Sequence, residues 1–365
     1  MAKEFDRKIV LEDGSEYFGY AFGDKNCDRV CEIVFNSSVV GYQEIISDPA
    51  YIHQAVVMTY PVIGNYGITD EDFESSTPYI GGLIVRDYND NPSNFRYTKT
   101  LSEVFSENHI PGIYGLDTRK LTRNIRDNGS MKVLITSVAT SKIKALEILA
   151  SADIPKNSVA KVSCRKPRYA RTANHTYNVV AVDCGIKSSA VSALNACGCN
   201  VTVMPYNSTA DEVLAMKPDG VFVSSGPGNP ENVPETVDLI KQLRGKLPIF
   251  ASGLGHQLLC LAYGAKVVKM KHGHRGSYPV KNLETGKLEC AAQSHGYVAL
   301  ADSLDCTKLE VTHINLSDNS VEGVECKEDK VFSVQYYPES APGPQDSNYL
   351  FSKFISLIKE AKSNA

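Results

Sequence analysis

The sequence predicts a two-domain α/β protein, with a β-rich N-terminal half and a C-terminal half built on a doubly wound parallel sheet. The chain has 365 residues, of which 42% are apolar, and this length favours two domains over one. The first half shows short strand patterns between loops rich in Gly, Asn, Pro and Tyr. From residue 178 onward, strand patterns alternate with helical patterns of about ten residues, which is typical of a parallel sheet.

In the N-terminal half, residues 9–11 and 17–20 flank a turn signal and predict a hairpin. Further strands are expected at residues 30–35, 56–59 and 82–85. A helix is expected to begin after Asp117, a favourable N-cap, and to run to Asp127 before Gly129. Nothing in this half indicates catalysis by itself.

Residues 163–175 are polar, basic and without apolar periodicity, so we place the domain boundary there. This gives an N-terminal domain of residues 1–165, a linker of residues 166–177 and a C-terminal domain of residues 178–365. In the C-terminal domain we expect strands at 178–183, 201–204 and 220–224. Helices are expected at 188–197 and 234–243, and another should begin at the capping box of residues 209–212. A final helix should begin at about residue 347.

Residues 247–264 carry the most informative pattern. A short buried strand at 248–250 leads through a tight turn at 251–255 into a helix at 254–263. This is the layout of a nucleophile elbow, in which a strained residue lifts its side chain above the sheet. The residue at the tip is Gly253, so the geometry of a covalent catalyst is predicted without a nucleophile.

Composition excludes several classes of function. The net charge of −4 and the lack of a long basic run argue against a nucleic-acid partner. No apolar run approaches ~18 residues, and the first residues do not resemble a signal peptide, so we expect no membrane span and a cytoplasmic protein. Ten scattered cysteines are expected to be reduced core thiols. His272 and His274 form a His-x-His pair without a third ligand candidate nearby, so no metal site is expected.

The run Phe250-Ala-Ser-Gly-Leu-Gly-His-Gln257 resembles the Gly-Ile-Cys-Leu-Gly-His-Gln elbow of class I (triad-type) glutamine amidotransferases. Its continuation through Met270 and Gly273-His-Arg-Gly276 is similar to the small subunits of carbamoyl phosphate synthetase. Motifs in the first half of the chain resemble signatures of that family's N-terminal domain. They are Phe35-Asn-Ser-Ser with Gly41-Tyr-Gln-Glu-Ile45, Thr59-Tyr-Pro with Gly64-Asn-Tyr-Gly67, Pro92-Ser-Asn-Phe95, and Gly115-Leu-Asp-Thr-Arg-Lys-Leu-Thr-Arg123.

The resemblance implies a chain that hydrolyses L-glutamine and passes ammonia to a large synthetase subunit, on which its N-terminal domain docks. ATP and Mg²⁺ are then expected on the large subunit, with no cofactor bound by this chain. No Walker-type phosphate loop occurs in the sequence, in agreement with that expectation. Arginine and pyrimidine biosynthesis both remain open as the pathway.

The resemblance also locates the catalytic positions. Amide hydrolysis through a covalent intermediate needs a nucleophile, a base and a group that orients the base. The family's cysteine falls at Gly253 and its histidine at Tyr337, while Glu339 retains the orienting position. A phenol with a pKa near ~10 is a poor base at neutral pH. The chain is therefore expected to be glutaminase-deficient.

Glutamine-binding positions are partly retained. By resemblance, the retained positions are Gly226, Gly228, Leu254, Gln257, Gly296 and Tyr297. Two positions differ, because Ala50 stands where the family usually has serine and Ser294 where it usually has asparagine. By resemblance, all of these differences from the family pattern therefore fall in one functional site.

Three functions remain open from the sequence. The first is a partner subunit of an ammonia-using ligase, and the second is a pseudoenzyme that senses glutamine or a similar amide. The third is a hydrolase with a rewired nucleophile. For that role, Ser252 should point to the other side of the turn, and Cys260 lies about 10 Å along the helix. Neither has an evident base.

Overall fold

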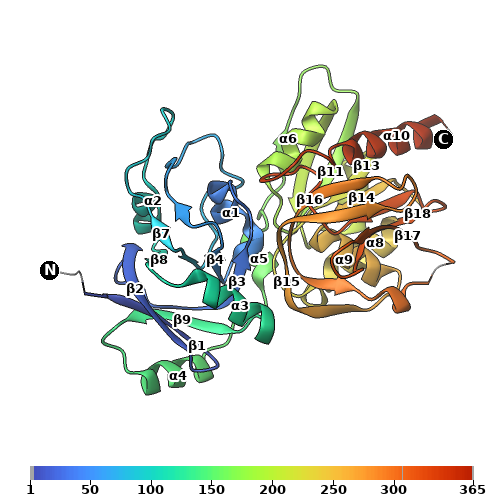
Figure 1. Cartoon of the computed structure of the whole chain (residues 1–365). Coiled ribbons are helices and arrows are strands. Elements are labelled where there is room, and N and C mark those ends of the chain that lie inside the picture. Colours follow the sequence, from blue (N-terminus) through green and yellow to red (C-terminus); the bar gives the residue numbers. More distant parts are fainter. Residues whose placement is uncertain (1–3, 306, 364–365) are drawn as a thin grey trace. The chain divides into compact units, whose positions relative to one another are not determined.

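The computed structural model describes residues 4–305 and 307–363, and the chain divides into two compact units, Met1–Pro155 and Lys156–Ala365 (Figure 1). This division falls ten residues before the predicted boundary after residue 165. Helix α5 (Ser158–Val162) and strand β10 (Arg168–Ala170) both belong to the second unit, and β10 pairs antiparallel with β12 (Cys199–Pro205). This edge strand is largely exposed and therefore lacks the apolar alternation by which a strand is recognised.

The described residues of the N-terminal unit form a closed barrel of seven strands in the order β1-β2-β8-β6-β4-β3-β9. The predicted hairpin is confirmed, because β1 and β2 pair antiparallel. Buried apolar side chains such as Ile33, Ala55 and Ile113 fill the interior of the barrel. The barrel strands are β1 (Arg7–Leu11), β2 (Glu16–Gly23), β3 (Arg29–Asn36), β4 (Gln54–Met58), β6 (Gly82–Ile84), β8 (Pro111–Tyr114) and β9 (Lys132–Ser137).

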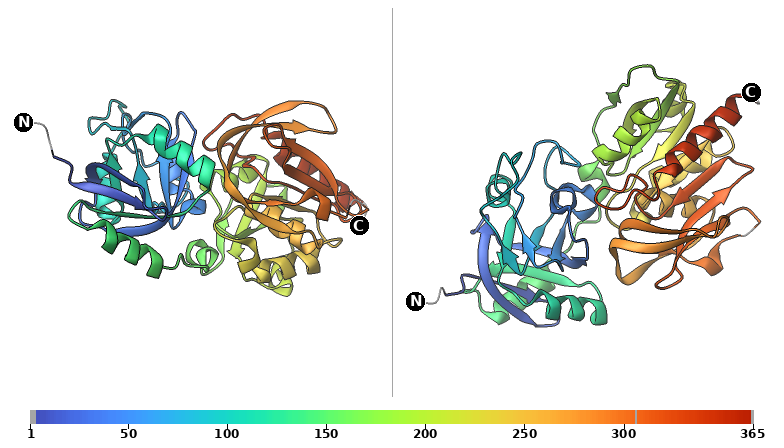
Figure 2. Two further views of the ribbon diagram at one scale, coloured as in Figure 1. Left: turned by 60° about the horizontal axis from the view of Figure 1, so that its bottom comes forward. Right: turned by 45° about the horizontal axis from the view of Figure 1, so that its top comes forward.

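Helices and a small second sheet surround the barrel. Helix α3 (Thr118–Asn128) begins as predicted, because the Asp117 carboxylate accepts a hydrogen bond from Lys120 N at 2.9 Å, and it ends at Gly129. Helix α4 (Lys142–Ser151) packs against β1 and β9 through Ala145 and Leu149 (Figure 2). The other elements are α1 (Tyr42–Ser47), η1 (Pro49–Tyr51), α2 (Leu101–Glu107), and the paired strands β5 (Val62–Ile63) and β7 (Asp87–Tyr88).

Within its described residues, the C-terminal unit contains a ten-stranded sheet in the order β10-β12-β11-β13-β14-β19-β18-β17-β15-β16. The run from β12 to β19 is parallel, as predicted, whereas the other pairings are antiparallel. Beyond β10 and β12, the strands are β11 (Tyr177–Asp183), β13 (Gly220–Val223), β14 (Ile249–Ser252), β15 (Val267–Asn282), β16 (Leu288–Ala299), β17 (Glu310–Asn315), β18 (Val321–Cys326) and β19 (Val331–Val334).

Helices cover both faces of the parallel strands, which gives two hydrophobic cores (Figure 1). Because side chains alternate along a strand, Val180 and Val182 of β11 enter one core while Val179 and Ala181 enter the other. Helices α8 and α9 line the first core, and α6 and α10 line the second. The helices of this unit, besides α5, are α6 (Ser188–Ala196), α7 (Ala210–Ala215), η2 (Pro230–Asn232), α8 (Pro234–Leu243), α9 (Leu254–Ala262), η3 (Ala301–Ser303) and α10 (Tyr349–Ser363).

Phe250 on β14 is the centre of an aromatic cluster in the second core. Its ring lies 4.4 Å from that of Phe332 and 5.7 Å from that of Phe351, measured between centroids. We expect Phe250→Ala to lower the free energy of unfolding by about 3–5 kcal/mol, because it leaves a large cavity. Urea unfolding followed by circular dichroism measures this change. Phe95→Ala is the matched control, since Phe95 is 93% exposed, and a loss as large as that of Phe250→Ala would contradict the assignment.

Candidate functional site

The predicted elbow is present between β14 and α9. Gly253 joins them with φ 55° and ψ −117°, a left-handed conformation that strongly favours glycine. Its N–H donates to the carbonyl of Val334 at 3.0 Å, and its own carbonyl accepts a hydrogen bond from Gln335 Nε2 at 3.3 Å. Both backbone polar groups of Gly253 are therefore hydrogen-bonded to residues at the end of β19.

The space above the elbow is occupied by Ser225, in the loop after β13. A Cβ atom built on Gly253 would lie 2.3 Å from Ser225 Oγ and 2.7 Å from Ser225 Cβ, closer than van der Waals contact permits. Ser225 is buried, and its hydroxyl has no hydrogen-bond partner among the described residues. The adjacent Gly226 approaches the carbonyl of Cys184 so closely that any side chain would overlap it. Ser225 thus fills the volume that a side chain at position 253 would need.

A buried ion pair involves Glu339, the predicted orienter, and lies against Tyr337 at the predicted base position. Lys187 Nζ is 3.6 Å from Glu339 Oε1, and both side chains are almost wholly buried. The same ammonium donates to the carbonyl of Ala341 and lies 4.2 Å from the centroid of the Tyr337 ring, within cation–π distance. Tyr337 is itself buried. The phenol and the carboxylate therefore both contact a lysine.

The sequence patterns did not identify Ser225 or Lys187 as residues of the site. The signal for Lys187 was its place directly between the buried strand at 178–183 and the helix at 188–197, at the carboxyl end of a parallel strand. The signal for Ser225 was the glycine that follows it in the loop after β13. Neither signal identifies the neighbour that each side chain contacts.

The predicted glutamine-binding positions of the C-terminal unit, with Ser294 among them, lie around this elbow. Gln257 on α9 donates through Nε2 to the carbonyl of Tyr297 at 2.9 Å and to Gln335 Oε1 at 3.1 Å. Leu254 is the buried first residue of α9 and lies beside the loop of Gly226 and Gly228, with its Cδ2 3.1 Å from a Cβ built on Gly226. The other two positions, Ser294 and Gly296, are on β16 with Tyr297.

Ala50 is placed differently from the other positions. It is the middle residue of η1 in the N-terminal unit, where its N–H donates to the Asp48 carboxylate at 2.8 Å. Its relation to the elbow remains a prediction from the resemblance.

Burial argues against Cys260 as a replacement nucleophile, although its Sγ lies 3.8 Å from His256 Nε2. It lies on α9 with its side chain fully buried, and this burial raises the pKa of the thiol to about 12. A thiol with such a pKa carries almost no thiolate at neutral pH. Ser252, the other neighbour considered, is the buried last residue of β14.

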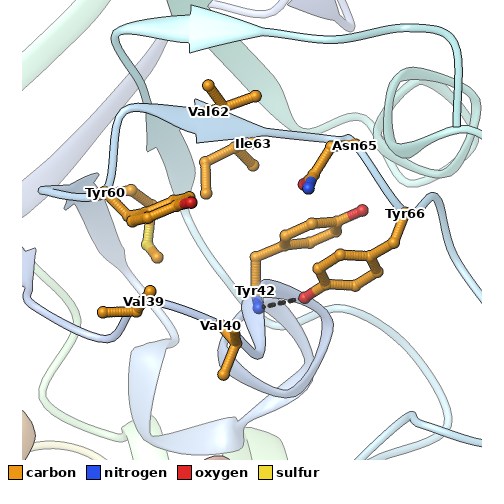
Figure 3. Close-up of a pocket in the computed structure, with 9 residues that line it drawn as sticks. Val39, Val40, Tyr42, Tyr60, Val62, Ile63, Asn65 and Tyr66 are labelled. Atoms are coloured by element: carbon orange, nitrogen blue, oxygen red, sulfur yellow. Dashed lines mark hydrogen bonds between the residues drawn. The ribbon is translucent and has the colours of Figure 1, made fainter. Parts of the chain in front are cut away.

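In the N-terminal unit, two of the sequence motifs come together around a small apolar pocket of about 80 Å³ (Figure 3). The Tyr42 and Tyr66 rings stack 3.9 Å apart between centroids, and the Tyr66 hydroxyl accepts a hydrogen bond from Tyr42 N at 2.8 Å. Val39 and Val40 at the rim are 61% and 66% exposed. The full lining is Val39, Val40, Tyr42, Met58, Tyr60, Val62, Ile63, Asn65 and Tyr66.

Each of the two units matches the model of a known protein family. Residues 180–357 match the model of glutamine amidotransferase class I, so the elbow belongs to a domain of that class. Residues 9–135 match the model of the carbamoyl-phosphate synthase small chain, CPSase domain.

Curated relatives cover nearly the whole chain. The carbamoyl phosphate synthase small chain of Staphylococcus epidermidis is 49% identical over 98% of this chain and 97% of its own length. The proteins of the same name from Fusobacterium nucleatum and Listeria innocua are each 47% identical, over 97% and 96% of this chain and 98% and 96% of their own lengths. This chain belongs to the carbamoyl phosphate synthase small chain family. Among the described residues, no helix is long and apolar enough to cross a membrane.

His256 on the elbow helix makes stability depend on pH. Its Nδ1 lies 2.9 Å from the Ser333 hydroxyl, and complete burial lowers its pKa to about 3. The unfolded chain takes up this proton near pH 6.5, while the folded chain does so only near pH 3, so stability falls as pH drops through that window. Between pH 7 and pH 5 we expect His256 to account for a loss of about 2 kcal/mol.

Urea unfolding of the wild type and of His256→Asn at both pH values measures that difference. His175→Asn serves as the control, because His175 is exposed. If the wild type and His256→Asn lose equal stability on acidification, the histidine is not held neutral by burial.

Proposed function

We propose that this chain is a carbamoyl phosphate synthase small subunit that associates with a large subunit but does not hydrolyse glutamine. The observation that carries the proposal is the overlap at the elbow, where Ser225 occupies the volume needed by a side chain at position 253. The site lacks a nucleophile and also lacks the space for one. Loss of glutaminase activity therefore involves at least one residue beyond Gly253 and Tyr337.

The contacts of Glu339 support the same proposal. A catalytic carboxylate in this arrangement orients a histidine base, whereas Glu339 here forms a buried ion pair with Lys187. The Tyr337 ring covers the ammonium of that pair. Removing one partner of a buried ion pair typically costs about 3–5 kcal/mol because it leaves an uncompensated charge, so Lys187 compensates the Glu339 carboxylate without any catalysis.

The N-terminal unit supports a role in association. Its pocket and the exposed valines at the rim, Val39 and Val40, form an apolar surface on the unit that matches the small-chain family. Apolar side chains of this kind are stabilised by burial against a partner. In our proposal that partner is the large subunit, which also carries the ATP and Mg²⁺ chemistry.

One observation favours a hydrolase with a rewired nucleophile as the second candidate. The Ser225 hydroxyl is a buried group without a hydrogen-bond partner among the described residues, and it lies at the tip of the elbow. A serine needs a base within hydrogen-bond reach to act as a nucleophile. The Ser225→Ala variant separates this candidate from the first.

We predict that the chain releases no glutamate from glutamine, alone or after co-purification with its large subunit. Carbamoyl phosphate formation by the complex should require ammonium, because no nucleophile is available to release ammonia from glutamine. A glutaminase rate of ~1 per second or more, within an order of magnitude of typical enzyme rates, would overturn the first candidate. Loss of such a rate in Ser225→Ala would establish the second.

Restoring activity should require three substitutions. Gly253→Cys alone overlaps Ser225, and Tyr337→His alone supplies a base with no nucleophile to activate. Ser225→Gly removes both overlapping side-chain atoms and leaves Ser225 Cα 3.3 Å from the new Cβ. We therefore expect glutamate release only when the three changes are combined, because the members of a catalytic unit do not act independently.

The controls are the three double variants, assayed for glutamate release and checked for folding by circular dichroism. Equal activity in the triple variant and in Gly253→Cys with Tyr337→His would show that Ser225 is no obstacle. Adding Ala50→Ser and Ser294→Asn should lower KM more than it raises kcat, since these groups bind ground state and transition state alike.

A further inference from the structure

Four buried side chains converge in the antiparallel half of the C-terminal sheet. His274 on β15 and His295 on β16 are direct cross-strand partners, and Glu322 on β18 lies close to both. Candidate ligand atoms of these three residues all lie within 4.8 Å of one another. Gln293 lies between the histidines, with its Oε1 3.1 Å from His274 Nδ1 and 2.9 Å from His295 Nε2. All four residues are at least 90% buried.

The outer nitrogen of each histidine has an acceptor that fixes the tautomer. His274 Nε2 lies 3.0 Å from the Asp318 carboxylate, and His295 Nδ1 lies 2.9 Å from the carbonyl of Tyr297. A carbonyl only accepts, so the His295 proton is on Nδ1 and its Nε2 presents a lone pair to the interior. Histidines that bind metals are oriented in this way by a carboxylate or a backbone carbonyl on the far nitrogen.

Two acceptor atoms face each other inside the cluster. With the His295 proton on Nδ1, the lone pair of His295 Nε2 faces Gln293 Oε1 at 2.9 Å. His274 Nδ1 contacts the same oxygen at 3.1 Å and also Asn315 Nδ2 at 3.3 Å. Glu322 Oε1 accepts from Asn315 Nδ2 at 2.9 Å, but Glu322 Oε2 has no hydrogen-bond partner among the described residues.

We propose that this cluster binds one Zn²⁺ ion through His274 Nδ1, His295 Nε2, Glu322 and Gln293 Oε1. Two imidazole nitrogens with two oxygens suit Zn²⁺, and ligand atoms around a tetrahedral Zn²⁺ lie about 3.4 Å apart. The separations of 2.9 Å, 3.1 Å and, between His274 Nδ1 and Glu322 Oε1, 3.6 Å agree with this spacing to within about half an ångström. A cation within the cluster would also provide a partner for Glu322 Oε2, which has none among the described residues.

The proposal departs from the sequence-based expectation of no metal, which among the histidines considered His272 and His274. The ion has an entry path, because the Asp318 side chain beside His274 is 38% exposed. Its role is structural, since all four of its ligands come from the protein. It would hold the stretch of β16 that carries Ser294 and Tyr297, adjacent to the elbow.

Zinc titration of the full-length, untagged chain tests the proposal. With the cysteines alkylated, we expect one Zn²⁺ per chain, measured by elemental analysis and by competition with a chelator. Co²⁺ in the same site should show visible d–d bands without thiolate charge-transfer bands. Zn²⁺ should also raise the thermal unfolding midpoint of the chain.

Three variants identify the ligands. Glu322→Gln keeps the volume and an acceptor for Asn315, and it should weaken Zn²⁺ binding at least tenfold. Asp318→Asn should weaken binding about 10–100-fold, as expected for a group that orients a ligand. His272→Gln is the matched control and should bind as the wild type does, because His272 lies outside the cluster.

The proposal is overturned if the alkylated wild type binds no Zn²⁺, or if Glu322→Gln binds it as tightly as the wild type. It is also overturned if His272→Gln loses binding while the cluster variants retain it. If Glu322→Gln fails to fold, the wild-type stoichiometry, the Co²⁺ spectrum and the partly exposed Asp318→Asn variant decide the question.

Discussion

The left-handed backbone of Gly253 is the constraint on which the candidate site depends. It lets the chain turn from β14 into α9 with its N–H and carbonyl both hydrogen-bonded to residues at the end of β19. Because β13, β14 and β19 are adjacent and parallel, the loops that follow them meet at one edge of the sheet. This edge therefore carries Ser225, Tyr337 and Glu339 together with the turn at Gly253.

Packing explains why the changes at this edge belong together. Protein interiors are close-packed, so the volume left by an absent side chain is filled by a neighbour or remains as a destabilising cavity. Ser225 fills that volume beside Gly253, and the Tyr337 ring covers Lys187. The ion pair between Lys187 and Glu339 keeps the carboxylate compensated in the buried site.

The antiparallel half of the same sheet links the elbow to the proposed zinc site. The carbonyl of Tyr297 accepts from Gln257 on the elbow helix and from His295 in the histidine cluster. A group that orders β16 at His295 therefore also orders the carbonyl that holds α9. This arrangement couples the position of the elbow to the packing of the cluster through one backbone group.

The sequence by itself determined the two-domain α/β fold, the elbow and the family resemblance, because these follow from local patterns. Period-two and helical apolar patterns predicted the strands and helices of the parallel sheet, and Asp117 and the capping box at Thr209 predicted where two helices begin. The identities of Gly253 and Tyr337 could likewise be read directly. Glycine at the turn agrees with its positive φ.

Only the tertiary structure decided what those residues contact. The overlap of Ser225 with position 253, the burial of Lys187 against Glu339, and the meeting of His274, His295 and Glu322 join segments far apart in the chain. Such contacts depend on the order of the strands in the sheet, which local apolar periodicity does not encode. Strand β10 was missed for a related reason, because an exposed edge strand shows no apolar alternation.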